Sequence, residues 1–137
     1  MIVKRSVIFI VFLIALVIGG FIAFKYWESY RIDDGVVAFK QGDYEKSFQL
    51  LYPLSELGNK TAKRLIGLSY AYGLGVDVNP DMAFDFLMES EKEPLVTFKE
   101  ISEVYRVGNE MVKANSELYG YWVKRSTEVD PKSWTAR

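Results

Sequence analysis

The sequence contains no cysteine and no histidine. The lack of cysteine excludes a disulfide framework and a thiol nucleophile, and the lack of both residue types excludes the usual zinc sites. Without histidine there is also no Ser-His-Asp triad. The missing disulfides do not exclude an oxidising compartment, but a domain there has to be held together by packing. Any catalysis would depend on Asp, Glu, Lys, Ser or Tyr alone, and no arrangement of these residues stands out.

A cluster of positive charge is also missing. From Tyr26 onward the chain carries 14 of its 17 basic residues and all 18 acidic residues, which gives a net charge of about −4. A nucleic-acid-binding domain needs clustered Lys and Arg to neutralise phosphates. The composition therefore argues against a nucleic-acid partner.

A long apolar run near the N-terminus is the most conspicuous feature that is present. Residues Val7 to Phe24 read "VIFIVFLIALVIGGFIAF" and contain no charge. Since each helical residue rises 1.5 Å, 18 residues form a helix of about 27 Å, close to the thickness of a bilayer core. We predict a transmembrane anchor that contacts lipid through residues 7–24. A cleaved signal peptide and a buried core helix are the alternatives, although this run is longer than a usual signal core and "GGFIAFKYW" is a poor cleavage site.

The residues flanking this run suggest an orientation. Lys4 and Arg5 lie on a very short tail, which favours a single-pass topology with the N-terminus in the cytoplasm and the remainder outside the cytoplasmic membrane. Residues suited to the opposite interface follow the run: Lys25, Tyr26, Trp27 and Tyr30.

Helix stop and start signals follow the anchor. In "AFKQGDYEKSFQLL", Gly42 is typical of a left-handed residue that ends a helix, and Asp43 is typical of the cap that begins the next. Tyr44, Ser47, Phe48 and Leu51 then recur at helical spacing. This pattern predicts a tight helical hairpin.

The segment "IGLSYAYGLGV" (residues 66–76) and its continuation predict a second hairpin. Gly73 and Gly75 flank Leu74 and supply positive φ angles, and Asn79-Pro80 begins the next helix. Gly67 and Ala83 are small, so the two helices can approach closely there. A phosphate-binding loop would need a preceding strand or a following Lys, and neither is present. The glycines are therefore interpreted as structural.

A third, weaker copy follows at nearly constant spacing. Tyr105 and Gly108 stand 35 residues after Tyr70 and Gly73. Units of this length, each a hairpin that cannot bury its own apolar face, are typical of α-solenoids. We predict an all-α fold of about three hairpins after one transmembrane helix. The predicted divisions are residues 1–28 (tail and anchor), 29–128 (repeats) and 129–137 (C-terminal tail).

The central unit carries a family resemblance. Residues 65–90, "LIGLSYAYGLGVDVNPDMAFDFLMES", resemble a Sel-one-like repeat, and the first unit resembles the related tetratricopeptide repeat. The central unit departs from the family pattern at Asn79, Met82 and Ser90, and the third unit departs at Glu110 and Leu118. The matching positions of the central unit are Ile66, Gly67, Tyr70, Gly73, Gly75, Val76, Ala83 and Phe86.

The resemblance implies a concave binding surface lined by the first helix of each hairpin. The expected surface changes from apolar near the membrane to charged at the far end, which suits an amphipathic peptide or helix. For the first unit, packing of the same residues on a juxtamembrane helix is the alternative. The residues nominated by register are Ile32, Val36 and Phe39 in the first unit, Arg64, Leu68 and Ala71 in the second, and Lys99, Glu103 and Arg106 in the third.

The function expected from these features is that of a membrane-anchored, non-catalytic protein-interaction module without cofactor, metal or small-molecule substrate. Proteins that resemble it are often bacterial scaffolds or adaptors facing the periplasm. The same resemblance also allows an immunity protein that neutralises a secreted effector such as a lipase. An enzyme at the membrane surface and an oligomer formed through Gly19-Gly20 are further alternatives.

Other motifs favour structural roles. The carboxylates Glu89, Glu91 and Glu93 are interpreted as a solvated connector, and the Lys63-Arg64 and Lys124-Arg125 pairs as surface positions. Tyr119, Tyr121 and Trp122 are predicted to pack the last hairpin and cover the end of the stack. Trp134 in the tail either docks as part of this cap or forms a recognition segment.

Overall fold

The computed structural model describes residues 2–90 and 94–129, with side chains from residue 7 onward. The side chains of Lys4 and Arg5, the connector residues Glu91 and Glu93, and Trp134 lie outside the described residues. The described segments form six helices and no strand. The helices are α1 (Ile2–Lys40), α2 (Tyr44–Glu56), α3 (Lys60–Tyr72), α4 (Pro80–Ser90), α5 (Pro94–Val107) and α6 (Ser116–Glu128). The prediction of an all-α chain is confirmed.

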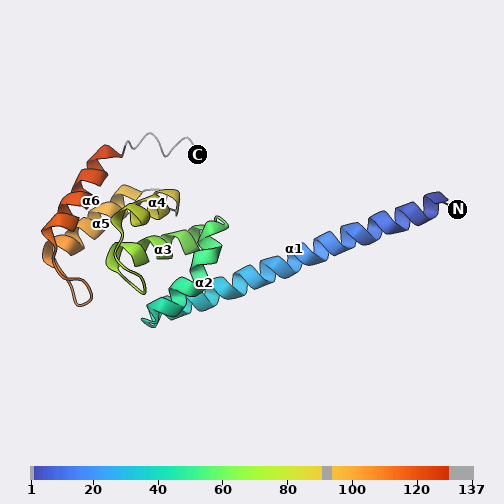
Figure 1. The fold of residues 1–137 in the computed structure, drawn as a ribbon, viewed down its shortest axis with the longest axis horizontal. Helices are drawn as coiled ribbons and strands as arrows, with labels where there is room; N and C mark the ends of the chain where they lie inside the picture. Colours follow the sequence, from blue (N-terminus) through green and yellow to red (C-terminus); the bar gives the residue numbers. More distant parts are fainter. Residues whose placement is uncertain (1, 91–93, 130–137) are drawn as a thin grey trace.

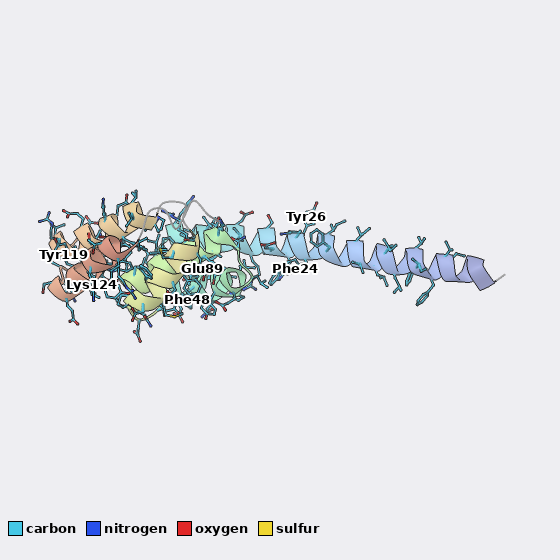
Figure 2. The ribbon with its side chains drawn as sticks, turned by 90° about the horizontal axis from the view of Figure 1, so that it is seen from above. Phe24, Tyr26, Phe48, Glu89, Tyr119 and Lys124 are labelled. Carbon is cyan, nitrogen blue, oxygen red and sulfur yellow. The ribbon has the colours of Figure 1, made fainter. Side chains whose placement is uncertain are left out.

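Helix α1 combines the apolar run with the first helix of the repeat region. It continues without interruption for 39 residues, and its N-terminal half projects alone from the other helices (Figure 1). Within Val7–Lys40, an 18-residue stretch has a mean hydropathy of 3.2, and none of it is buried. Figure 2 shows side chains of this stretch extending from both edges of the ribbon, with Phe24 and Tyr26 near the repeat domain. By length and composition, α1 can cross a membrane.

The first hairpin pairs the C-terminal part of α1 with α2. Gly42 has φ of 80°, and the Asp43 side chain accepts a hydrogen bond from the Lys46 backbone N–H at 3.4 Å. The Ser47 hydroxyl donates to the Gly35 carbonyl oxygen at 2.9 Å. A Cβ atom at Gly35 would lie 2.5 Å from the Leu51 side chain, so glycine permits this close approach. The predicted stop and start signals at this turn are confirmed.

The second hairpin, α3 and α4, repeats this construction. A Cβ at Gly67 would lie 2.7 Å from Leu87, which is fully buried. Gly73 and Gly75 both have φ of 72° in the connecting loop. The Asn79 side chain accepts a hydrogen bond from the Met82 backbone N–H at 3.1 Å, so it caps α4, which begins at Pro80. The predicted hairpin and the structural role of its glycines are confirmed.

The third hairpin, α5 and α6, shows that the period near 35 residues is real despite its weaker sequence signal. Gly108 has φ of 78°, as its spacing from Gly73 predicts. The Asn115 side chain accepts hydrogen bonds from the backbone N–H groups of the first turn of α6. Trp122 is fully buried, 35 residues after Leu87. Tyr119 and Tyr121 are half-buried against the same cluster, which confirms that this aromatic group packs the last hairpin.

Two aromatic clusters join the hairpins. The first cluster lies between hairpins one and two, with ring centroids 5.4 Å apart for Phe48–Tyr70 and 6.0 Å apart for Tyr70–Phe86. In the second cluster, between hairpins two and three, Phe98 lies between Phe84 at 5.1 Å and Trp122 at 5.4 Å. Such aromatic pairs stabilise beyond simple area burial. Each hairpin thus buries its apolar face against the next, as a solenoid requires.

At the end of the domain farthest from the free part of α1, the α3–α4 and α5–α6 loops both contact the N-terminus of α2. Glycine at position 75 allows the α3–α4 loop to lie against the backbone of Tyr44, because a Cβ there would approach that backbone to 2.5 Å. The Tyr44 hydroxyl donates to the Met111 sulfur in the α5–α6 loop at 3.2 Å. The N-terminus of α2 therefore receives contacts from both later loops, and Figure 1 shows all three turns at one end of the stack.

Candidate protein-interaction face

The three residues nominated in the first unit lie on the C-terminal part of α1, and all are half-buried. Ile32 packs against the cluster that contains Leu51 and Ile66. The Phe39 ring meets the Tyr44 ring edge-on at 5.3 Å between centroids. Because Trp27 and Tyr30 belong to the same unbroken helix, there is no separate juxtamembrane helix against which these side chains could pack. Ile32 and Phe39 therefore contribute mainly to the first hairpin, and Val36 is half-buried beside them.

The second unit divides into surface and core residues. Arg64 is exposed on α3, whereas Leu68 is half-buried against the cluster formed with α5. Ala71 is only 1% exposed, and its carbonyl oxygen accepts a hydrogen bond from the Tyr105 hydroxyl. Ala71 is thus a core residue and not a surface residue, because it belongs to the buried cluster with Leu87 of α4 and Tyr105 of α5. Burial also raises the pKa of the neighbouring Tyr72 to about 12, which reflects the low exposure of this junction to water.

The third unit presents all its nominated residues to solvent. Lys99, Glu103 and Arg106 are exposed along α5. The opposite side of α5 is in the core, where Phe98 and Ile101 are fully buried. Since α5 is amphipathic at helical spacing, its outer side is a continuous strip.

This strip carries apolar side chains as well as charges. Val96 is 52% exposed and Val107 is 58% exposed, one at each end of α5. Between them, charges of both signs are interspersed and sum to zero. We call this strip the outer α5 face, and it consists of Val96, Lys99, Glu100, Glu103, Arg106 and Val107.

One ion pair organises the charges on the outer α5 face. The Arg106 Nε donates to the Glu103 carboxylate at 2.8 Å. This hydrogen bond holds the pKa of Glu103 below its usual value and raises the pKa of Arg106, so both remain charged at neutral pH. Both side chains are about half exposed, at 56% and 52%. Such a pair contributes little to folding, so its groups can exchange partners at little cost.

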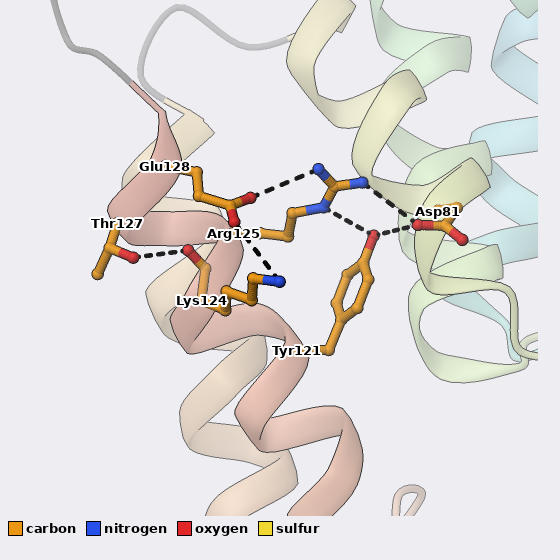
Figure 3. A network of polar contacts seen from close by, with 6 residues as sticks. All are labelled: Asp81, Tyr121, Lys124, Arg125, Thr127 and Glu128. Atoms are coloured by element: carbon orange, nitrogen blue, oxygen red, sulfur yellow. Dashed lines mark hydrogen bonds and ion pairs between the residues drawn. The ribbon is translucent and has the colours of Figure 1, made fainter.

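A polar network that the sequence pattern did not reveal joins the second hairpin to the third (Figure 3). The Tyr121 hydroxyl donates to the Asp81 carboxylate at 2.7 Å, and the Arg125 Nη2 lies 3.4 Å from the same oxygen. The Arg125 guanidinium also lies 4.4 Å from the centroid of the Phe84 ring. Arg125 is therefore a structural residue, and the interpretation of Lys124-Arg125 as a plain surface pair is incomplete.

The Asp81 carboxylate gives a test of this network. The hydrogen bond from Tyr121 is the main cause that lowers the Asp81 pKa, followed by contacts from Arg125. A lowered pKa means that the contact stabilises the fold above the ordinary pKa of Asp and that this stabilisation is lost as pH falls through the folded-state pKa.

In Tyr121→Phe, we expect the Asp81 pKa to rise toward its ordinary value in a carboxyl-detected NMR titration. Tyr119→Phe, on the same helix, should leave it unchanged. An unaltered Asp81 pKa in Tyr121→Phe would show that the bond is not populated.

A shallow hollow of about 260 Å³ lies between the first two hairpins. It is lined by Glu56, Asp85 and Glu89 with Lys63, which forms an ion pair with Glu89. Three carboxylates against one amine give this hollow a negative charge. Within residues 2–90 and 94–129, no three acidic side chains converge as metal ligands.

Comparisons with known proteins give a local likeness only. No family model matches the sequence. A 61-residue segment is 39% identical to part of Protein DSF2 from Saccharomyces cerevisiae, covering 44% of this chain and 8% of that protein. The chain therefore spans a small fraction of the length of the curated relative it matches.

Proposed function

We propose that this protein is a membrane-anchored, non-catalytic interaction module of the Sel-one-like and tetratricopeptide type, which binds a protein partner through its helical repeats outside the cytoplasmic membrane. The observation that carries the proposal is the outer α5 face. It combines two exposed valines with charges of both signs, on a helix whose other side is fixed in the core.

Its composition suits a partner helix or peptide with both apolar and charged residues. Val96 and Val107 stand 11 residues apart, so the strip is about 16 Å long, which matches about three turns of a partner helix. The apolar ends supply contact area, and the interspersed charges fix the register of the partner along α5. Arg64 on α3 adds a positive charge to the exposed set of nominated residues.

The recurring geometry of the hairpins supports the repeat-family part of the proposal. Gly35 faces Leu51 in the first hairpin, as Gly67 faces Leu87 in the second. The same small-against-large contact thus recurs in both units, and solenoids of this kind present extended binding surfaces.

The proposal predicts loss of a partner when the positive charges of the outer α5 face are reversed. We expect Lys99→Glu combined with Arg106→Glu to reduce capture of a specific protein at least tenfold, because the strip would then carry four negative charges and no positive one. A tenfold loss corresponds to about 1.4 kcal/mol of binding free energy. The measurement is quantitative affinity capture of the full-length protein from detergent-solubilised native membranes, with helicity checked by circular dichroism.

A matched control distinguishes the effect of the position of the reversed charges from the effect of the change in net charge. Lys46→Glu combined with Lys124→Glu changes the net charge by the same amount at exposed positions on α2 and α6. This control should retain the partner. Equal capture by all three proteins, or equal loss in both variants, would contradict the assignment of the outer α5 face.

A further inference from the structure

The turn between α2 and α3 lies beside the point where α1 leaves its apolar run. The Asn59 amide in this turn donates to the Glu28 carboxylate of α1 at 3.2 Å. The Arg31 guanidinium, one helical turn further, lies 3.4 Å from the carbonyl oxygens of Gln49 and Leu50 on α2. The middle of α2 and the N-cap of α3 are thereby held against α1.

The position of Glu28 sets the depth of this turn relative to a membrane. Glu28 follows Phe24, the last residue of the apolar run, by four residues, which is about 6 Å along a helix. The headgroup layer on each side of the hydrocarbon core is on the order of 5–8 Å thick. If α1 spans the bilayer, the α2–α3 turn therefore lies at headgroup depth, together with Trp27 and Tyr30, which are predicted from the sequence to lie at the membrane interface.

The turn presents an apolar side chain at this depth. Leu57 is 60% exposed, whereas Leu54, one turn earlier, is fully buried. The backbone around Leu57 is well defined, because the N–H groups of Gly58 and Asn59 donate to the carbonyl oxygens of Ser55 and Leu54, both at 3.0 Å. Most of the Leu57 side chain therefore lies outside the domain, where it is open to contact with a surface beside the turn.

Lys60, the first residue of α3, is also exposed beside this turn. A cation at a helix N-terminus is unfavourable for the helix dipole, so Lys60 is not placed there to stabilise α3. An amine at headgroup depth can instead contact lipid phosphates.

We propose that the α2–α3 turn is a second membrane contact, in which Leu57 enters the interfacial layer of the bilayer that α1 spans. This inference rests on the proposed anchoring by α1. The contact would hold the repeat domain against the lipid surface and fix the rotation of α1 about its own axis, since interfacial side chains set the tilt and rotation of a spanning helix.

The absence of cysteine allows a direct test, because single-cysteine variants can carry a spin label at one chosen site. Leu57→Cys reports the turn, Leu16→Cys reports the anchor, and Val107→Cys is the matched control. Val107 is 58% exposed, nearly as much as Leu57, but it ends α5 at the loop whose Met111 contacts the N-terminus of α2, away from the α2–α3 turn. Each full-length variant is reconstituted in vesicles of phosphatidylcholine and phosphatidylglycerol. The accessibility of each label to oxygen and to a water-soluble nickel chelate is then measured by power saturation.

We expect the label at residue 57 to lose most of its nickel accessibility relative to residue 107 and to gain oxygen accessibility. The label at residue 16 should be accessible to oxygen and protected from nickel. If residue 16 is lipid-exposed while residue 57 is as accessible to nickel as residue 107, the inference about the turn is overturned and the anchor stands. If residue 16 itself is open to nickel, the proposed anchoring fails and the turn inference fails with it.

Discussion

Replacing Trp122 with alanine is expected to lower the free energy of unfolding by about 3–5 kcal/mol, the range found for truncating a large buried aromatic side chain. Trp122 is 0% exposed and is the largest fully buried side chain among the described residues. Its ring lies 5.4 Å from that of Phe98, which in turn contacts Phe84. Alanine would leave a cavity between the second and third hairpins, so we expect the third hairpin to detach. The measurement is urea unfolding of the full-length protein in detergent micelles, followed by far-ultraviolet circular dichroism.

Trp122→Phe separates ring packing from the indole N–H. The Nε1 atom of Trp122 is buried and has no hydrogen-bond partner among the described residues. Phenylalanine loses some contact area but also removes this unsatisfied donor, whose burial costs about 1–3 kcal/mol. We therefore expect the free energy of unfolding of Trp122→Phe to lie within about 1 kcal/mol of that of the natural protein. A loss as large as that of the alanine variant would contradict the expectation that removing the buried N–H offsets the lost contact area.

Replacing Gly75 with alanine is expected to lower the free energy of unfolding by about 3 kcal/mol. Backbone strain contributes about 1–2 kcal/mol, and overpacking contributes about 1–3 kcal/mol. Gly75 has φ of 72°, and a Cβ there would lie 2.5 Å from the carbonyl carbon of Tyr44. Because backbone cannot rotate away as a flexible side chain can, the loop would have to leave the N-terminus of α2. The same urea titration measures the effect.

Two other glycines provide controls for Gly75. Gly42 has φ of 80°, but a Cβ added at this position would have no neighbour within 4 Å, so Gly42→Ala should cost only the strain term of about 1 kcal/mol. Gly120 lies inside α6 with open space around it, so Gly120→Ala should stabilise by about 0.5–1 kcal/mol. Equal losses for Gly75→Ala and Gly42→Ala would mean that the contact with Tyr44 is absent in solution.

The local signals of the fold could be predicted because each acts within a few residues. Gly42, Gly73 and Gly108 all adopt positive φ where the chain leaves a helix. Asp43 and Asn79 cap the helices that follow them. Glycine conformation and side-chain capping depend on nearest neighbours, so one sequence suffices to identify them.

The candidate surface was harder to predict, because which residues of each helix are exposed depends on how the hairpins stack. The charged nominees Arg64, Lys99, Glu103 and Arg106 are exposed, whereas Ala71 is in the core and Leu68 is half-buried. A family register assumes a regular superhelix. Here the Tyr105 side chain of α5 reaches the C-terminal end of α3 and covers Ala71, a position that a more open stack would expose.

Long-range polar contacts left no pattern in the sequence. Tyr121 and Asp81 are 40 residues apart, and Tyr44 and Met111 are 67 residues apart. The helical pattern identifies Tyr44 and Tyr121 as packing residues, but it does not indicate which distant side chain accepts a hydrogen bond from either hydroxyl group. Only the fold brings the partners together.

Because α1 is one unbroken helix, no flexible joint separates the apolar run from the first hairpin. No proline interrupts the helix between the end of the apolar run and Lys40, and the last turns of this helix are part of the first hairpin. A spanning helix joined in this way turns and tilts together with the domain it carries, whereas a flexible tether would let the domain search a wide volume. With the proposed anchoring, the reach of the domain would be short and its height above the lipid constant, so the proposed partner would have to approach along the membrane to meet it.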